Sequence, residues 1–288
     1  MSRNLGVIGF GLMGSEIALL GAMAGWEVHA VARNVEKMEP VVARLGKVLR
    51  MLSRDEKHFA REQLATDEGR QAIIDRIHLH TELSSLSGCD YVIESAPEVL
   101  ELKHAIFSEL AGICREDCIL ATNTSSFGIT QIAAATNCQE RVIGMHFFNP
   151  PTAMALVEVI PGLNSSEDTT SRTEELAQQM GKTSIRVQET PGFVVNRILT
   201  AMMNEAMNLY EEGAASIEDI DTAMKLGAGF PLGPFRLADL VGLDTYEHTC
   251  DSIYRETGRQ HFKTPRTVKQ YVKGGRLGRK NRHGFHKY

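Results

Sequence analysis

The stretch Gly9-Phe10-Gly11-Leu12-Met13-Gly14 constrains the fold of this chain more than any other feature. It follows an apolar run, Leu5 to Ile8, and opens a segment with helical character that extends to about Ala24. With this spacing the first glycine permits a tight turn, the second lets backbone approach a pyrophosphate, and the third lets helix and strand pack closely. The sequence therefore predicts a dinucleotide-binding strand, loop and helix, with residues 9–14 contacting the cofactor.

The rest of the first half alternates between strand-like and helical segments. Such alternation is typical of a Rossmann-type α/β fold with a mostly parallel sheet. Gly25 follows the first helix as a left-handed cap. We expect strands at Leu5–Ile8, Glu27–Ala32, Ile77–Leu79, Tyr91–Ile93, Ile119–Ala121, Val142–Met145 and Leu156–Ile160, and a helix at Val99–Ile113.

Two segments depart from this alternation. Residues 35–75 are charged with helical periodicity, and Ser53-Arg54-Asp55-Glu56 has the pattern of a capping box, which predicts an inserted hairpin of two helices. Beyond about residue 190 no strand is predicted, and the apolar residues Val195, Ile198, Met202, Ala206 and Leu209 mark one long helix. We therefore expect a dinucleotide-binding domain over 1–188 and an all-α substrate and dimerisation domain over 189–288.

His146 and Glu158 are the candidate catalytic pair. Each occurs in an apolar stretch, Gly144-Met145-His146-Phe147-Phe148 and Leu156-Val157-Glu158-Val159-Ile160. Buried groups of this kind are costly unless they pair, and a paired carboxylate fixes the tautomer of a general-base histidine. A base beside a dinucleotide indicates hydride transfer between an alcohol and its ketone. Strand alternation also allows Glu158 to be a solvent-facing residue.

The end of the second predicted strand bears on which dinucleotide binds. An acid at this position normally accepts a hydrogen bond from the adenosine 2′-hydroxyl of NAD, but the sequence has Ala32, followed by Arg33 and Asn34. Without the acid, Arg33 can pair with a 2′-phosphate, so the sequence favours NADP. The alternative is that Arg33 is solvated and NAD binds through other contacts.

Composition excludes several other classes of protein. The 288 residues carry a net charge of −5, which argues against general nucleic-acid binding. We expect a cytoplasmic protein, because no apolar run reaches membrane-spanning length and the first strand leaves no room for a signal peptide. The five cysteines form no CxxC pair, so we expect reduced thiols and no metal site, although Cys114 and Cys118 could meet on a helical turn.

Several blocks in one order resemble the L-3-hydroxyacyl-CoA dehydrogenases, including the short-chain 3-hydroxybutyryl-CoA type, over nearly the whole chain. The matching stretches are VIGFGLMGSEIA, YVIESAPEVLELKHAIF, ATNTSSFGIT, RVIGMHFFNPP, LVEVIPG, ETPGFVVNRIL with NEA, GAGFPLGPF with LADLVGLD, and LGRKNRHGFHKY. The resemblance implies reversible oxidation of an (S)-3-hydroxyacyl-CoA to the 3-oxoacyl-CoA with a nicotinamide dinucleotide, in a homodimer built through the helical domain.

The family's residue roles transfer by position. The resemblance places the base on His146, its orienting acid on Glu158, and the groups that hold the substrate oxygens on Ser125 and Asn196. It places cofactor contacts on Glu98, Lys103, Asn149 and Lys280. Ser125 and Asn196 could alternatively serve only to cap helices or turns.

The family also places its coenzyme A contacts on the hairpin after the second strand. Here cations recur every three or four residues on it, at Arg44, Lys47, Arg50, Arg54, Lys57 and Arg61. A solvated charged face explains these residues equally well. We therefore predict that the hairpin region contacts coenzyme A, but we assign no single residue to that contact.

Three alternatives remain open. A dehydrogenase of free hydroxy acids would need a lysine on the first helix of the second domain, where this chain has Asn196 and Arg197. A sugar-acid 3-dehydrogenase would share the histidine and glutamate. A dinucleotide-binding protein with a structural or sensor role would not need the intact pair.

Overall fold

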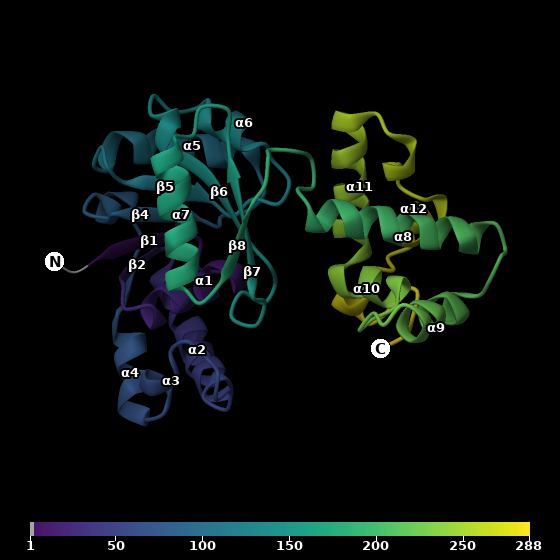
Figure 1. Cartoon of the computed structure of the whole chain (residues 1–288), viewed down its shortest axis with the longest axis horizontal. Coiled ribbons are helices and arrows are strands. Elements are labelled where there is room, and N and C mark those ends of the chain that lie inside the picture. The colour runs from purple at the N-terminus through teal and green to yellow at the C-terminus, as the bar shows by residue number, and fades with distance from the viewer. Residues whose placement is uncertain (1–2) are drawn as a thin grey trace. The chain divides into compact units, whose positions relative to one another are not determined.

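A computed structural model describes residues 3–288, apart from the side chain of Val35. The chain divides into two compact units, residues 1–189 and 190–288. The first is a sheet with helices, drawn from purple to teal in Figure 1, and the second is helical, drawn from green to yellow.

The first unit contains one eight-stranded sheet with the order β3-β2-β1-β4-β5-β6-β7-β8. β1 to β6 are parallel, β7 runs antiparallel to β6, and β8 is parallel to β7. The mostly parallel sheet predicted from the alternation is confirmed. The strands are β1 (Asn4–Ile8), β2 (Glu27–Val31), β3 (Ile77–His80), β4 (Tyr91–Glu94), β5 (Ile119–Thr122), β6 (Val142–Phe147), β7 (Leu156–Pro161) and β8 (Thr183–Arg186).

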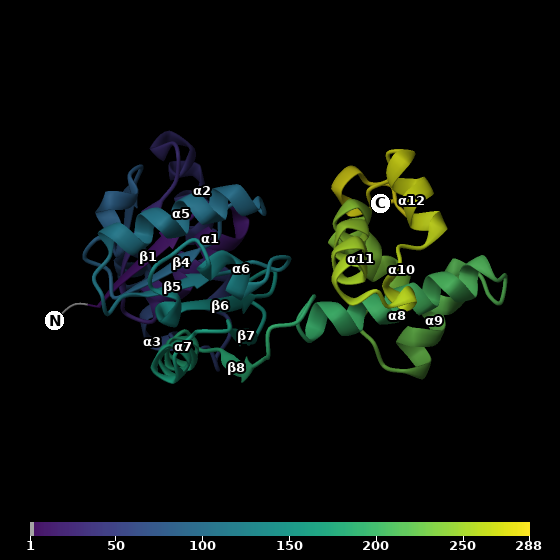
Figure 2. The ribbon, with the colours of Figure 1, turned by 90° about the horizontal axis from the view of Figure 1, so that it is seen from above.

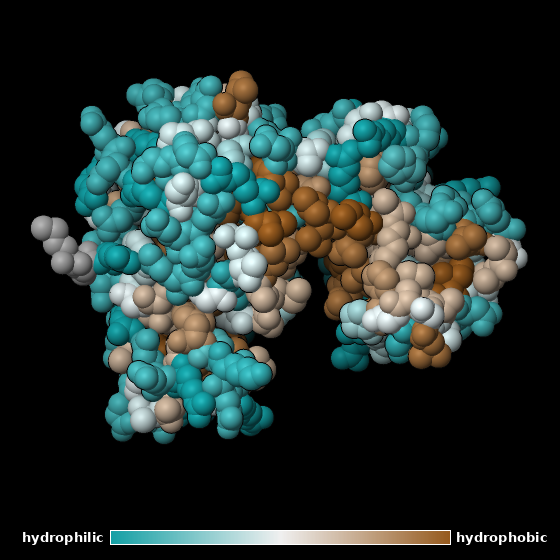
Figure 3. Space-filling view, viewed as in Figure 1, coloured by the Kyte–Doolittle hydropathy of each residue, from teal (hydrophilic) through white to brown (hydrophobic). Residues whose placement is uncertain are grey.

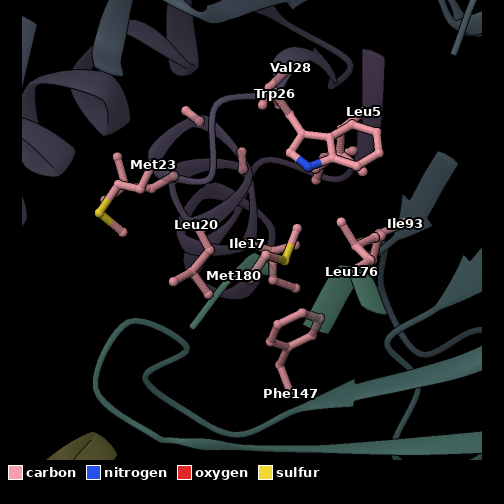
Figure 4. Close-up of a cluster of buried hydrophobic side chains, with 14 of the residues drawn as sticks. Leu5, Ile17, Leu20, Met23, Trp26, Val28, Ile93, Phe147, Leu176 and Met180 are labelled. Atoms are coloured by element: carbon pink, nitrogen blue, oxygen red, sulfur yellow. The ribbon is translucent and has the colours of Figure 1, made fainter. Parts of the chain in front are cut away.

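Helices cover both faces of this sheet. On one face α1 and α7 share a core with the sheet, in which Ile17 and Leu20 lie near Leu176 and Met180 (Figure 4). On the other face lie α5 and α6 (Figure 2). The helices of this unit are α1 (Leu12–Met23), α2 (Glu39–Leu52), α3 (Arg61–Leu64), α4 (Asp67–Asp75), α5 (Leu100–Ile113), α6 (Ile129–Ala133) and α7 (Glu167–Gln179).

The inserted hairpin differs from the prediction. No helix begins at Ser53; this residue ends α2, and its hydroxyl donates to the Arg50 carbonyl. Residues 53–60 form turns, the short α3 follows, and α4 begins after Thr66, whose hydroxyl accepts from the Gly69 N–H. The predicted capping box at Ser53 was wrong, because a serine with a glutamate three residues later also fits a helix end followed by turns.

The second unit contains α8 (Val195–Glu211), α9 (Ile217–Gly227), α10 (Pro234–Val241), α11 (Leu243–Thr257) and α12 (Arg266–Lys273). Its core gathers Met203, Met207, Phe235, Tyr246 and Val268. The long helix predicted after residue 190 is confirmed as α8, but its buried face matches the predicted stripe only in part: Ala206 is buried and Met202 packs against the core. Thr200, Met203, Asn204, Ala206 and Met207 are buried, whereas Ile198 and Leu209 of the predicted stripe are exposed.

Candidate active site at the carboxyl edge of the sheet

The glycine loop lies between β1 and α1, where the strand order of the sheet reverses. Gly9 has φ +87°, and a Cβ on it would lie 2.4 Å from the Ser95 carbonyl oxygen. A Cβ on Gly14 would lie 1.8 Å from the Gly9 carbonyl oxygen, so the first and third glycines are required by close approach.

The middle glycine differs, because a Cβ on Gly11 would meet nothing within 4 Å. The loop therefore leaves open space beside its backbone at the start of α1, where N–H groups at a helix N-terminus favour phosphate. No acidic residue lies in the first turn of α1 to oppose such a ligand. The loop and helix thus fit the pyrophosphate of a dinucleotide.

The adenosine end of such a ligand would lie near the end of β2. The Val31 carbonyl accepts from the Gly9 N–H, so this strand end adjoins the glycine loop. Ala32 follows and is partly buried, and Arg33 and Asn34 are exposed. No acidic side chain occupies these three positions.

His146 and Glu158 lie opposite each other in the antiparallel β6–β7 pair. His146 Nδ1 is 2.8 Å from Glu158 Oε2, and the two residues are 5% and 0% exposed. The antiparallel turn brings the start of β7 beside the end of β6, so both side chains reach the carboxyl edge of the sheet. Complete burial rules out a solvent-facing Glu158, and the Phe148 ring packs edge-on against the imidazole.

A second buried ion pair lies at the end of β4. The Lys103 ammonium donates to both oxygens of Glu94, at 2.8 and 2.9 Å, and both side chains are buried. Glu94 also accepts from the Thr122 hydroxyl and from the Ala96 N–H. The sequence singled out Lys103 but missed Glu94, although it lies in the same block, YVIESAPE.

Glu98 connects this pair to Ser125. One carboxylate oxygen accepts from the Ser125 N–H at 2.9 Å, and the other accepts from the Thr124 hydroxyl at 2.9 Å. The same oxygen lies 3.6 Å from the Lys103 ammonium. The structure thus brings Glu98, Lys103 and Ser125 together at the adjoining ends of β4 and β5.

Asn123 is a further residue that the sequence reasoning missed. Its side-chain carbonyl accepts from the Phe147 N–H at 2.8 Å, which joins the end of β5 to the residue after His146. Its amide donates to the Ser95 hydroxyl. Its place in the motif Asn123-Thr124-Ser125-Ser126 is the only signal for it in the sequence. Asn149 lies three residues after His146 and is exposed.

Asn196 and Lys280 belong to the helical unit. Asn196 is the second residue of α8 and is partly buried. The Lys280 ammonium donates to Asp244 Oδ1 at 2.7 Å and to the Thr245 hydroxyl at 2.9 Å. The C-terminal segment that carries Lys280 is fastened to α10, because Asp239 accepts from the N–H groups of Phe285 and His286.

The hairpin cations are not equivalent. Arg44 donates to the Ser15 hydroxyl and forms an ion pair with Glu16, and Arg61 donates to the Glu56 carbonyl. Arg54 and Lys57 lie on turns and not on a second helix.

Among residues 3–288 no cluster of three or more His, Cys, Asp or Glu side chains could hold a metal ion, and none of the helices there combines the length and the apolar character of a membrane span. The five cysteines are free and buried. Burial raises the pKa of the Cys89 thiol to about 12.

The chain is similar to known proteins over nearly its whole length. Residues 4–190 match the family model 3-hydroxyacyl-CoA dehydrogenase, NAD binding domain, and residues 192–288 match 3-hydroxyacyl-CoA dehydrogenase, C-terminal domain. The chain is 41% identical to a 3-hydroxybutyryl-CoA dehydrogenase of Clostridioides difficile, over 99% of each chain. It is 39% identical to the human mitochondrial hydroxyacyl-coenzyme A dehydrogenase, over 99% of this chain and 91% of that one.

A solved structure shares the fold at similar identity. The crystal structure of (S)-3-hydroxybutyryl-CoA dehydrogenase from Ralstonia eutropha superposes with a TM-score of 0.93 at 40% identity, over 100% of this chain and 99% of that one.

Proposed function

The chain belongs to the 3-hydroxyacyl-CoA dehydrogenase family, and from that premise we propose that it interconverts short-chain (S)-3-hydroxyacyl-CoA, such as 3-hydroxybutyryl-CoA, and the 3-oxoacyl-CoA. It is an oxidoreductase with an NAD-binding domain. The observation that carries the proposal is the buried His146–Glu158 pair at the same sheet edge as the open glycine loop.

His146 serves as the general base in oxidation. Glu158 accepts the hydrogen bond from Nδ1, so the proton of the substrate 3-hydroxyl passes to Nε2. The imidazolium that results is stabilised by the Glu158 carboxylate, and in the reverse direction it returns the proton to the ketone oxygen. The bound nicotinamide ring supplies the two-electron acceptor, or the hydride donor in reduction.

The remaining site residues bind and orient. Ser125 and Asn196 hold the substrate 3-oxygen and thioester carbonyl, which keeps the hydroxyl in line with His146. Glu98, Asn149 and Lys280 line the dinucleotide site together with the loop of residues 9–14. Lys103 is buried, pairs with Glu94 and lies 3.6 Å from Glu98, so its role there is to hold these two carboxylates in place.

The experiment that tests the proposal is acetoacetyl-CoA reduction, followed at 340 nm. We expect His146→Asn to retain cofactor binding and to lose at least about 10²-fold in kcat. Near-normal turnover in this variant would mean that another group is the base. Wild-type protein that oxidises a free hydroxy acid or sugar acid and leaves acetoacetyl-CoA untouched would overturn the substrate assignment.

The preferred dinucleotide is a separate part of the proposal. Ala32 removes the acid that would repel a 2′-phosphate, and the exposed Arg33 next to it supplies a cation, so we assign a preference for NADP. We expect kcat/KM to favour NADPH about ten- to a hundredfold and Arg33→Ala to abolish the preference. A wild-type preference for NADH contradicts this assignment and leaves the reaction unaffected.

The acyl-CoA phosphates are assigned to the hairpin, where Lys47, Arg50, Arg54 and Lys57 supply cations. A homodimer through the helical unit and a cytoplasmic location complete the proposal. Apolar residues reach the surface of that unit in Figure 3, and among its exposed side chains are Ile198 and Leu226, which supports the dimer.

A further inference from the structure

Glu16 is a buried carboxylate on the dinucleotide-binding helix that the proposed chemistry does not use. It lies two residues after Gly14 in α1 and is 4% exposed. Its Oε2 accepts from the Thr152 hydroxyl at 2.7 Å and from the Thr152 N–H at 3.2 Å. Its Oε1 accepts from the Arg44 guanidinium at 3.3 Å. A buried carboxylate persists only with such partners, so these contacts define its position.

The two carboxylate oxygens hold different parts of the molecule. Thr152 belongs to the loop that leaves β6 after His146, carries Asn149 and enters β7 before Glu158. Arg44 belongs to α2 of the inserted hairpin and also donates to the Ser15 hydroxyl at 2.7 Å. One side chain of α1 therefore fastens both the loop of residues 148–155 and the hairpin to the helix that begins at the glycine loop.

Lys182 fastens the same loop from the other side. Its buried ammonium donates to the carbonyls of Pro151, at 2.7 Å, and Met154, at 2.9 Å. Glu16 interacts with this ammonium electrostatically, and the ammonium in turn lowers the pKa of His58. The preceding residue, Gly181, packs closely against the Phe59 ring of the hairpin turn: a Cβ on Gly181 would lie 2.3 Å from a ring carbon.

We propose that Glu16 is a positioning residue for both ligands: through Thr152 it fixes the loop that presents Asn149 to the dinucleotide, and through Arg44 it fixes the hairpin that presents cations to the acyl-CoA. The inference rests on the roles of Asn149 and the hairpin in the proposed function. Neither Thr152 nor Glu16 touches a ligand in this scheme, so their loss acts on binding through the order of the loop and the hairpin.

Two substitutions of Glu16 separate the two contacts. Glu16→Gln keeps a carbonyl oxygen for Thr152 but loses the charge opposite Arg44. We expect the Kd of the dinucleotide to stay within about twofold of wild type and the KM for acetoacetyl-CoA to rise about fivefold. Glu16→Ala loses both contacts, and we expect the Kd for the dinucleotide to rise about tenfold as well.

Thr152→Val and Arg44→Met test the same contacts from the partner side. Thr152→Val removes the hydroxyl at nearly constant shape, and we expect it to raise the dinucleotide Kd about fivefold without raising the KM for acetoacetyl-CoA. Arg44→Met should raise the KM for acetoacetyl-CoA without raising the dinucleotide Kd. These two variants also carry the test if Glu16→Ala does not fold. Glu109→Ala, at an exposed position of α5, is the matched control and should change neither constant.

Dinucleotide Kd is read from NADH and NADPH fluorescence on mixing with the full-length protein, which needs no turnover. A Thr152→Val protein with a wild-type Kd, or a Glu16→Ala protein that loses thermal stability but keeps both constants, would show a purely structural role and overturn the inference. Absence of acetoacetyl-CoA turnover in the wild type, with a Kd that still responds to Thr152→Val, would instead defeat the proposed substrate and retain the loop contact.

Discussion

Glu158 contacts His146 Nδ1 at 2.8 Å, and in the proposed mechanism its charge also stabilises the imidazolium. A glutamine at this position keeps the size and one acceptor but cannot stabilise the imidazolium that forms when the substrate proton is taken up. We expect Glu158→Gln to lower kcat for acetoacetyl-CoA reduction about 10²-fold and to leave the dinucleotide Kd near the wild-type value. Stopped-flow and steady-state rates on the same preparation would check this, and an unchanged kcat would mean that orientation alone is sufficient.

Arg282 has a left-handed backbone conformation, with φ +63°, that glycine adopts at less cost. Its side chain is exposed. We expect Arg282→Gly to raise the free energy of unfolding by about 0.5 to 1 kcal/mol, since relief of the strain exceeds the entropy cost of an added glycine. Urea unfolding would measure it. Arg279→Gly is the control, because Arg279 does not have a positive φ and so offers no such strain to relieve. A loss of stability in Arg282→Gly would refute the argument.

At the scale of the element, the start of α4 depends on one side chain. The Thr66 hydroxyl accepts from the Gly69 N–H at 3.0 Å and caps the helix. We expect Thr66→Ala to cost about 1 kcal/mol of unfolding free energy. Ser53→Ala is the comparison, because Ser53 follows α2 and caps no helix start. Its substitution should lower the unfolding free energy by only a few tenths of a kcal/mol. Equal losses in urea unfolding would contradict the capping role of Thr66.

Lys182, the residue before β8, makes the free energy of unfolding depend on pH. Burial lowers the pKa of the Lys182 ammonium to about 8, against the opposing effect of Glu16. The unfolded chain therefore binds the extra proton between about pH 8 and 10.5, and the unfolding free energy rises with pH over that window. The rise is on the order of 2 to 3 kcal/mol. Lys182→Met should remove it, which chemical unfolding at pH 7.5 and 10 would show as the difference between the two proteins.

At the scale of the whole molecule, exposed apolar side chains on the helical unit predict self-association. Ile198 on α8 is 64% exposed and Leu226 on α9 is 81% exposed. We expect Ile198→Asp and Leu226→Asp to shift the protein from dimer to monomer, because a charge cannot be buried unpaired in an interface. Light scattering after gel filtration would measure the mass.

Leu163 in the sheet unit provides the matched control, since it is 80% exposed but lies outside the helical unit. Leu163→Asp should leave the mass unchanged. A monomeric wild-type protein, or a dimer that survives both substitutions in the helical unit, would refute the assignment of the interface.

Much of the fold follows from local patterns. The seven predicted strands all exist, because each is a short apolar run bounded by turns or by a helix. β8 was not predicted, since Thr183–Arg186 is short and partly exposed and has no apolar run. The buried face of α8 was predicted only in part, because the helix is apolar on two sides. The packing of Met203 and Met207 against Phe235 and Tyr246 shows which side is covered.

The sequence by itself determined the glycine loop, seven of the eight strands and the residue types of the His146–Glu158 pair, because turn geometry and hydrophobic periodicity act within a few residues. Only the tertiary structure decided that His146 and Glu158 meet at 2.8 Å, since that requires the antiparallel register of β6 and β7. The same holds for Glu16 and Thr152, which lie 136 residues apart in the chain. A buried charge is stable only with its partners in place, and no local pattern records which distant residue supplies them.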